Sequence, residues 1–213
     1  MATPLIKLGI SKAVIDFFED AFKVDSYGNI IFDYGEDKFE LFGLNKHILP
    51  KFSKPWITHK EILHVITDVY LFESALEAIC FAHCRYSKIK EQAFDNALFL
   101  SLGAMPLPEV MGWVCDALLL KKFHFVFSNS LLGRVMDCRV AVKLANKAVK
   151  ISHYDEVVFV DYGGSSFQFD EDEFSLDAFK KASGFHFRNG RTHKPPKPFK
   201  SFLELIKASS NKD

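Results

Sequence analysis

Short apolar runs alternate with helix-like stretches from residue 69 onward, and this alternation constrains the fold more than any other feature of the sequence. The runs are residues 69–74, 97–102, 123–128 and 156–162, and a stretch with helical spacing follows each of them. Apolar strands separated by helices are typical of βαβ units, in which a parallel sheet is covered on both faces. We therefore expect an α/β fold with these four strands in one parallel sheet and right-handed crossovers.

The segment before the first apolar run has a different pattern. Residues 8–22 show apolar spacing close to the helical period, and Ser11 is placed to cap a helix there. Residues 24–45 hold short aromatic-rich runs punctuated by Gly28-Asn29 and Gly35. Such runs between turn residues are typical of a β-meander. This part of the chain is therefore expected to form a small α+β subdomain.

The end of the chain is basic. No acidic residue occurs between Arg188 and Lys200, and three prolines within this stretch favour an extended backbone. A solvated surface is the simplest interpretation of such a charge run, but the run also suits a phosphate backbone. The candidate contacts are Arg188, Arg191, Lys194 and Lys197. The expected organisation is a subdomain at residues 1–66, a sheet domain at 67–185 and a basic, proline-containing tail at 186–213.

The overall charge gives no general attraction to nucleic acid or to an anionic membrane. Lys and Arg number 27, and Asp and Glu also number 27, so any such binding must come from a local patch. No apolar run approaches the roughly 18 residues needed to cross a bilayer. The first residues also lack the pattern of a signal peptide. We expect a cytoplasmic protein without membrane contact, in which the 4 cysteines are reduced thiols.

Polar residues follow the predicted strands at the points where a site is expected. In open parallel sheets, binding and catalytic sites form beyond the carboxyl ends of the strands. Glu73 lies near the end of the first run, Ser128, Asn129 and Ser130 end or follow the third, and Asp161 lies near the end of the fourth. A buried carboxylate is unfavourable unless it is hydrogen-bonded or neutralised, so Glu73 should have a partner.

These strand ends resemble those of the Toprim family, which is shared by bacterial primases, topoisomerases and related nucleases. The family carries Glu-Gly-x-x-Asp after the first strand, where residues 73–77 read Glu-Ser-Ala-Leu-Glu. It carries Asp-x-Asp after the third strand, where residues 128–130 read Ser-Asn-Ser. The preceding stretches LGISKAVIDFF and KFSKPWITHK are similar to the subdomain before Toprim in bacterial primases and in primase-like proteins of mobile elements. The resemblance covers roughly residues 5–183.

The resemblance implies a Toprim-like (Rossmann-like) parallel sheet and also a catalytic chemistry. In active members the first-strand glutamate serves as acid or base and the Asp-x-Asp pair helps to hold Mg²⁺; Glu73 and Glu77 stand at the acidic positions of the first motif. Mg²⁺ prefers charged oxygen ligands, and replacing two carboxylates by hydroxyls removes several kcal/mol of attraction at an effective dielectric of about 20. Phosphoryl transfer depends on that metal. We therefore expect the usual activity to be absent or severely weakened, with no cofactor, Mg²⁺ being the alternative.

A metal site could still be rebuilt from other acids. Asp161 ends the fourth predicted strand, so it could face Glu73 across the site and, together with Glu77, hold the ion. Asp161 is equally suited to capping the turn at Gly163-Gly164. This alternative makes the chain a divergent, metal-dependent phosphoryl-transfer enzyme of the primase or nuclease kind.

The serines allow a different use of the same edge. Hydroxyls, free backbone N–H groups and a helix dipole suit phosphate better than a dication, so Ser128, Ser130 and Arg134 are candidate anion or nucleic-acid contacts. Capping of the following helix is the simpler role for the serines. The leading hypothesis is a non-catalytic, primase-like protein that binds nucleic acid or a replication or mobilisation partner. A protein–protein interaction module without nucleic acid is a further alternative.

Overall fold

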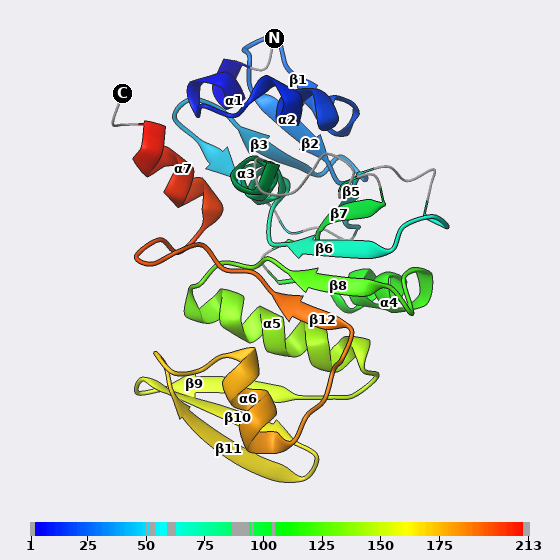
Figure 1. Ribbon diagram of the computed structural model, residues 1–213, viewed down its shortest axis with the longest axis vertical. Coiled ribbons are helices and arrows are strands. Elements are labelled where there is room, and N and C mark those ends of the chain that lie inside the picture. Colours follow the sequence, from blue (N-terminus) through cyan, green and yellow to red (C-terminus); the bar gives the residue numbers. More distant parts are fainter. Residues whose placement is uncertain are drawn as a thin grey trace.

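The computed structural model describes residues 3–49, 51, 54–58, 63–86, 94, 96–103 and 105–210. Three parts follow one another along its longest axis: the N-terminal helices and meander, a five-stranded mixed sheet with helices beside it, and a three-stranded antiparallel sheet (Figure 1). No helix among the described residues is long and apolar enough to cross a membrane. The fold is thus mixed α/β, as the alternating pattern predicts.

The central sheet contains the first three predicted strands. Its order is β12-β8-β6-β7-β5, in which β12, β8, β6 and β7 run parallel and β5 pairs antiparallel with β7. The bounds are Trp56–Ile57 for β5, Asp68–Phe72 for β6, Ala97–Ser101 for β7, Lys122–Phe125 for β8 and Gly190–Thr192 for β12.

Both faces of this sheet are buried around β6 and β7, which explains their continuous apolar runs. Val69 and Leu71 pack in one core with helices α4 and α5, whereas Tyr70 and Phe72 pack in the other with α3 and the N-terminal part. Successive side chains of a strand point to opposite faces, so each face receives every second residue. The helix bounds are Ala75–Tyr86 for α3, Pro108–Ala117 for α4 and Leu131–Leu144 for α5. Residues 87–93, which follow α3 in the stretch with helical spacing, lie outside the described ones.

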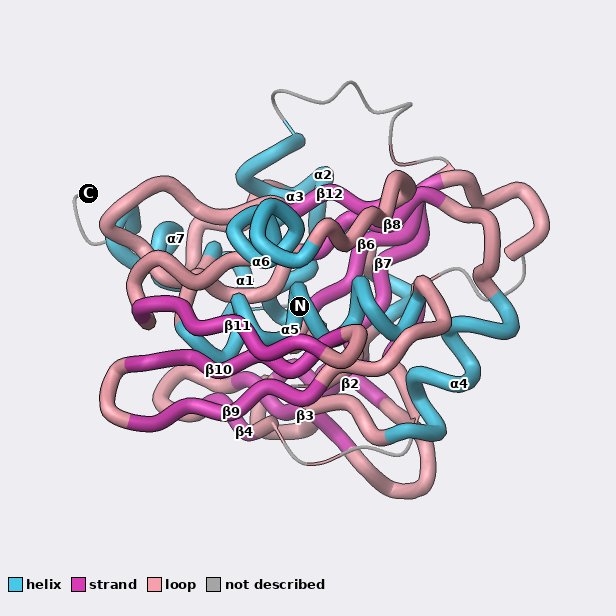
Figure 2. Tube along the Cα trace, turned by 90° about the horizontal axis from the view of Figure 1, so that it is seen from below, coloured by secondary structure: helices cyan, strands magenta, loops and turns pink. Residues whose placement is uncertain are grey.

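The prediction for the fourth strand was wrong in its placement. Residues 157–162 do form a strand, but it is the middle of the antiparallel sheet β11-β10-β9, which is a layer separate from β6 and β8 (Figure 2). Val158 and Val160 are buried, while Val157 and Phe159 are only partly so. An alternating pattern of this kind is typical of an antiparallel strand with one covered face. The bounds are Lys150–Tyr154 for β9, Val157–Tyr162 for β10 and Ser165–Asp170 for β11.

The N-terminal part contains the predicted meander, but its helices differ from the predicted one. Four short strands pair antiparallel in the order β1-β2-β3-β4. The predicted helix at residues 8–22 is shorter in the structure: Gly9, with a φ of +78°, lies between α1 and α2, and α2 ends at Phe17, before a short 3-10 helix. Ser11 occupies the N-cap position of the second helix without a side-chain capping bond. The bounds are Thr3–Lys7 for α1, Lys12–Phe17 for α2, Glu19–Ala21 for the short 3-10 helix η1, Lys23–Val24 for β1, Ile30–Asp33 for β2, Phe39–Phe42 for β3 and His47–Ile48 for β4.

The described residues after 175 form two helices and a strand that belong to the fold. Helix α6, Leu176–Ser183, is capped by the Ser175 hydroxyl, and Gly184 ends it in a left-handed conformation. The chain then returns to the central sheet as β12, which pairs parallel with β8 at the edge of the sheet. Helix α7, Phe202–Ser210, packs against α3. The stretch at 186–213 therefore contributes an edge strand and a helix, within its described residues.

Candidate functional site

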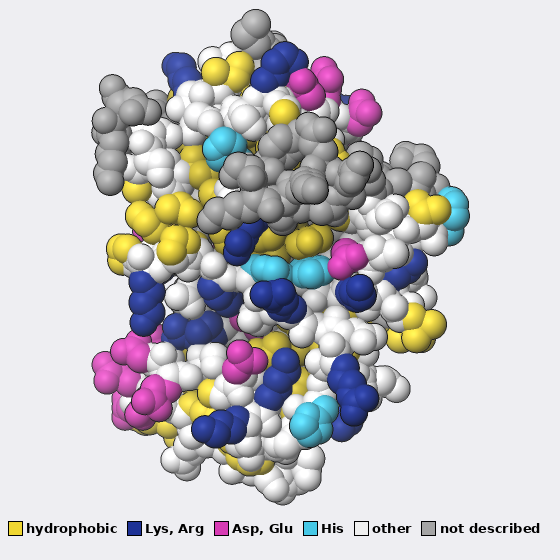
Figure 3. Space-filling view, in the orientation of Figure 1, with side chains coloured by type: hydrophobic (Ala, Val, Ile, Leu, Met, Phe, Trp, Pro, Cys, Tyr) yellow, Lys and Arg dark blue, Asp and Glu magenta, His cyan; other side chains and the backbone are white. Residues whose placement is uncertain are grey.

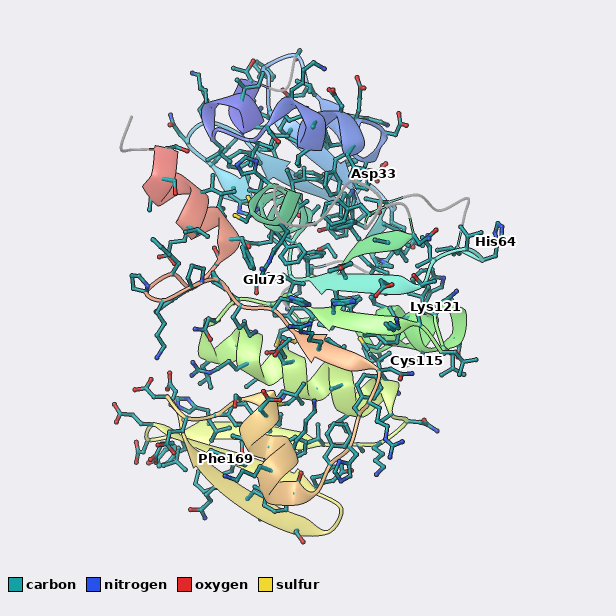
Figure 4. The ribbon with its side chains drawn as sticks, in the orientation of Figure 1. Asp33, His64, Glu73, Cys115, Lys121 and Phe169 are labelled. Atoms are coloured by element: carbon teal, nitrogen blue, oxygen red, sulfur yellow. The ribbon has the colours of Figure 1, made fainter. Side chains whose placement is uncertain are left out.

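The structure brings Glu73 and Ser128 together at one edge of the central sheet. Glu73 follows β6, where Figure 4 labels it, and Ser128 follows the neighbouring strand β8. The backbone N–H of Ser128 donates to Oε2 of Glu73 over 3.3 Å. Burial raises the pKa of Glu73 above its usual range, although hydrogen bonding from Ser128 and the positive charge of Lys194 oppose the rise. Glu73 thus has the partner that its burial requires.

The two serines are bonded to each other and to the start of α5. Their Oγ atoms lie 2.8 Å apart, and the Ser130 hydroxyl accepts from the backbone N–H of Gly133 over 3.2 Å. The chain turns so tightly here that a Cβ on Gly133 would lie 2.0 Å from the carbonyl oxygen of Ser128. Ser130 is therefore a helix cap, as the simpler interpretation predicts.

A lysine ammonium lies at the same strand end. Nζ of Lys194 donates to the carbonyl oxygens of Phe127 and Ser128 over 2.8 and 3.1 Å, and it pairs with Oδ2 of Asp137 at 2.6 Å. Asp137 comes from α5 and is 1% exposed. Burial raises the pKa of Asp137 to about 7, while the charge of Lys194 acts in the opposite direction. Lys194, predicted as a nucleic-acid contact, thus has its charge paired inside the protein.

Glu77 has a partner of a different kind. Its two carboxylate oxygens accept from the backbone N–H groups of Phe202 and Leu203 over 3.0 and 3.1 Å, at the first turn of α7. Burial, with repulsion from Glu73, raises the pKa of Glu77 to about 7. The carboxylate satisfies donors that the helix itself leaves free. Glu77 therefore joins α3 to α7.

Asp161 is not brought to this edge. It lies on β10, where it accepts from the Ser166 hydroxyl of β11. Helix α5 lies between this sheet and the central sheet, and Figure 4 labels Phe169 of the same sheet well away from Glu73. Within the described ranges, no group of three or more His, Cys, Asp or Glu side chains is arranged to hold a metal ion. The rebuilt metal site with Glu73, Glu77 and Asp161 is thus not assembled.

The charged groups of the remaining predicted contacts differ in whether they are bonded within the protein or exposed. The Arg134 guanidinium donates to the carbonyl oxygens of Asn129 and Glu171 over 3.3 and 2.6 Å, so it fastens the start of α5 to the loop after β11. Arg188, Arg191 and Lys197 are exposed. Of the predicted basic contacts, these three therefore have charges accessible to a partner.

Two buried carboxylates with structural contacts were not predicted from the sequence. Asp137 lies inside a helix that carries no recognised motif, and Glu40 lies inside the predicted meander. Glu40 is fully buried and accepts from the backbone N–H groups of Ala75 and Leu76 over 2.7 and 3.1 Å, which caps α3. A charged residue between apolar neighbours in a predicted strand was the available signal in Phe39–Phe42.

The comparisons with known proteins add no assignment to this geometry. No protein-family model, no curated protein and no solved structure matches the chain.

Proposed function

We propose that this chain is a catalytically degenerate, primase-like Toprim protein that binds nucleic acid or a replication or mobilisation partner. The supporting observation is the Lys194 ammonium, which lies against the carboxyl end of β8 and is held by two carbonyl oxygens and Asp137. An active member of the family would need carboxylates and a dication at that strand end. Here the edge already contains a cation supplied by the chain.

Electrostatics favours this interpretation over metal-dependent catalysis. A bound dication would lie near the Lys194 ammonium, and like charges at short range repel even at an effective dielectric of about 20. The Glu77 carboxylate is occupied by two backbone donors, and Asp161 belongs to another sheet. Glu73 alone retains its position at the edge, and one carboxylate is a poor ligand set for Mg²⁺.

Exposed basic side chains support the nucleic-acid part of the proposal. Arg188, Arg191 and Lys197 lie within ten residues of one another and are exposed, and Arg191 stands on the edge strand β12. Exposed cations close together in the sequence can attract a phosphate backbone in a salt-dependent way, even when the whole chain is neutral. An acidic protein surface would suit the same side chains, and it is the alternative partner.

The test combines binding with turnover. We expect the intact chain to bind a fluorescein-labelled 30-nucleotide single strand, with affinity that falls steeply between 50 and 200 mM salt, as about three phosphate contacts would require. We expect no cleavage or primer synthesis in the presence of Mg²⁺ or Mn²⁺. Metal-dependent turnover that Glu73→Gln abolishes would overturn the degenerate assignment. If the chain binds no oligonucleotide, the proposed partner is a replication or mobilisation protein. A salt-dependent pull-down with candidate replication proteins then tests that alternative.

A further inference from the structure

A second polar cluster lies on the central sheet, away from the edge with Glu73. Helix α3 packs against β6 and β7, and on the same face of the sheet Arg191 of β12 stands opposite His124 of β8, which stands opposite Tyr70 of β6. Residues directly opposite in neighbouring strands share a face, so these three side chains form a row. The His124 and Tyr70 rings stack at 4.2 Å with an interplanar angle of 12°.

Hydrogen bonds hold two histidines in line within this cluster. Nε2 of His124 lies 2.9 Å from Oδ1 of Asp68, and Nδ1 of His124 lies 2.8 Å from Nε2 of His193. Burial acts to raise the pKa of Asp68, but hydrogen bonds from Thr67 and His124 bring it below its usual value. Asp68 is thus an ionised acceptor that fixes the His124 ring, and His124 in turn fixes His193.

Two arginines flank the end of this chain of rings. Burial, with repulsion from His124, Arg191 and Arg85, lowers the pKa of His193 to about 4. Arg85 lies over the Phe81 ring at 5.8 Å, and Arg191 is exposed. Neither guanidinium forms a salt bridge or a hydrogen bond with the described residues. The space-filling view shows adjacent histidines on the face toward the viewer, with Lys and Arg side chains above and below them and an Asp or Glu side chain beside them (Figure 3).

The charges on this surface favour an anion with several phosphates. Guanidinium groups bind phosphate oxygens through paired N–H donors, and partial burial strengthens such contacts. Lys122, exposed on β8 two residues before His124, extends the positive surface along the strand. The cations are therefore spread over three elements instead of surrounding one point, which suits a chain of phosphates better than a single ion.

We propose that Arg85, Lys122, Arg191 and His193, here called the histidine–arginine surface, bind the phosphate backbone of a nucleic acid. This inference rests on the nucleic-acid binding proposed above and names its main contact surface. His124 occupies Nε2 of His193, so Nδ1 of His193 is the ring nitrogen that remains for a phosphate oxygen. Asp68 and His124 are then positioning residues for His193.

The experiment compares two double variants of the intact chain by fluorescence anisotropy with the labelled 30-nucleotide single strand. R85A/R191A removes two charges from the histidine–arginine surface. K150A/K181A removes two charges from exposed positions on β9 and α6 and is the matched control. We expect R85A/R191A to weaken binding on the order of tenfold or more at 50 mM salt and to reduce the salt slope by about 1.4. The control should change affinity less than about threefold.

The outcomes separate this inference from the proposed function. If the wild type binds and R85A/R191A binds equally well while R188A/K197A loses affinity, the tail residues are the main contacts and this surface is not. If R85A/R191A and K150A/K181A weaken binding equally, the attraction is general and the inference fails. If the wild type binds no oligonucleotide, nucleic-acid binding itself is wrong. Circular dichroism of each variant shows that it is folded, and R85K/R191K, which keeps the charge, should bind between the wild type and R85A/R191A.

Discussion

Glu40 and Glu77 are both buried acids whose carboxylates bond the N-termini of helices. Glu40 caps α3 from the meander, and Glu77, inside α3, caps α7. A carboxylate at a helix N-terminus satisfies free N–H groups and interacts favourably with the helix dipole. The proposed relation to the Toprim family would put Glu77 at an acidic motif position, whereas the contacts of its side chain give it a structural role. The sequence predicts an acid at this position. It does not predict that the carboxylate bonds to backbone N–H groups of α7, because α7 is 125 residues away in the chain.

The raised pKa of Glu77 makes its contribution to stability depend on pH. Its folded pKa of about 7 lies above the value of about 4.3 in an unfolded chain, so the folded state holds the proton more tightly between these values. The stability that this difference supplies is present at low pH and is lost as the pH rises through 7. We expect the wild type to lose about 2–3 kcal/mol relative to Glu77→Gln between pH 5 and 8. Urea unfolding of both proteins at several pH values measures the difference.

Other groups titrate in the same window, and the comparison removes them. Asp137 contributes in the same direction, whereas His193, whose pKa is lowered to about 4, contributes in the opposite direction. Both are present in the wild type and in Glu77→Gln, so they cancel in the difference, whereas Glu73, whose charge repels that of Glu77, contributes to it. A difference in free energy of unfolding that stays constant from pH 5 to 8 would contradict the assignment.

At the scale of elements, the apolar runs located strands well but could not assign every strand to its sheet. Residues 69–74, 97–102 and 123–128 are strands of the central sheet because both faces are covered there. Residues 156–162 look equally apolar, but their partners β9 and β11 are mostly polar strands with only Ile151, Phe167 and Phe169 facing the core, and they form no continuous apolar run. The actual fourth parallel strand, Gly190–Thr192, has no apolar residue and is visible only through its pairing with β8.

The tight turn from β8 into α5 restricts which residue can stand at position 133. A methyl group on Gly133 would meet the backbone carbonyl of Ser128, whereas a methyl group on Gly112 in α4 meets nothing within 4 Å. We expect Gly133→Ala to destabilise the protein by about 3 kcal/mol, because backbone must shift to accept it. We expect Gly112→Ala to stabilise it by about 0.5–1 kcal/mol through higher helix propensity.

Chemical denaturation of the two alanine variants measures both effects. The variants add the same atoms to helices of the same protein, so their difference reports the local space and not the residue type. Equal free energies of unfolding for Gly133→Ala and the wild type would show that the tight turn is not required.

At the scale of the whole molecule, the basic segment cannot be treated as a removable tail. Its described residues supply the edge strand β12, the Lys194 ammonium that pairs with buried Asp137, and the helix α7 whose N-terminus Glu77 caps. Removing one partner of a buried ion pair leaves the other charge unpaired and costs about 3–5 kcal/mol. The loss of β12 also exposes the edge of β8, which favours aggregation.

We therefore expect deletion of residues 186–213 to abolish cooperative unfolding, and not merely to weaken ligand binding. The deletion would remove the bonding partners of Asp137 and of Glu77, two buried carboxylates that contact this segment. Thermal melting followed by circular dichroism, with light scattering to detect aggregation, measures the effect. The matched control is Arg188→Ala/Lys197→Ala, which removes exposed charge from the same segment and should keep the wild-type melting temperature to within about 2 °C, since surface substitutions have small effects on stability. A truncated chain that melts cooperatively at the wild-type temperature would show that β12 and α7 are accessory, and in that case deletion would be a valid test of binding by the basic segment.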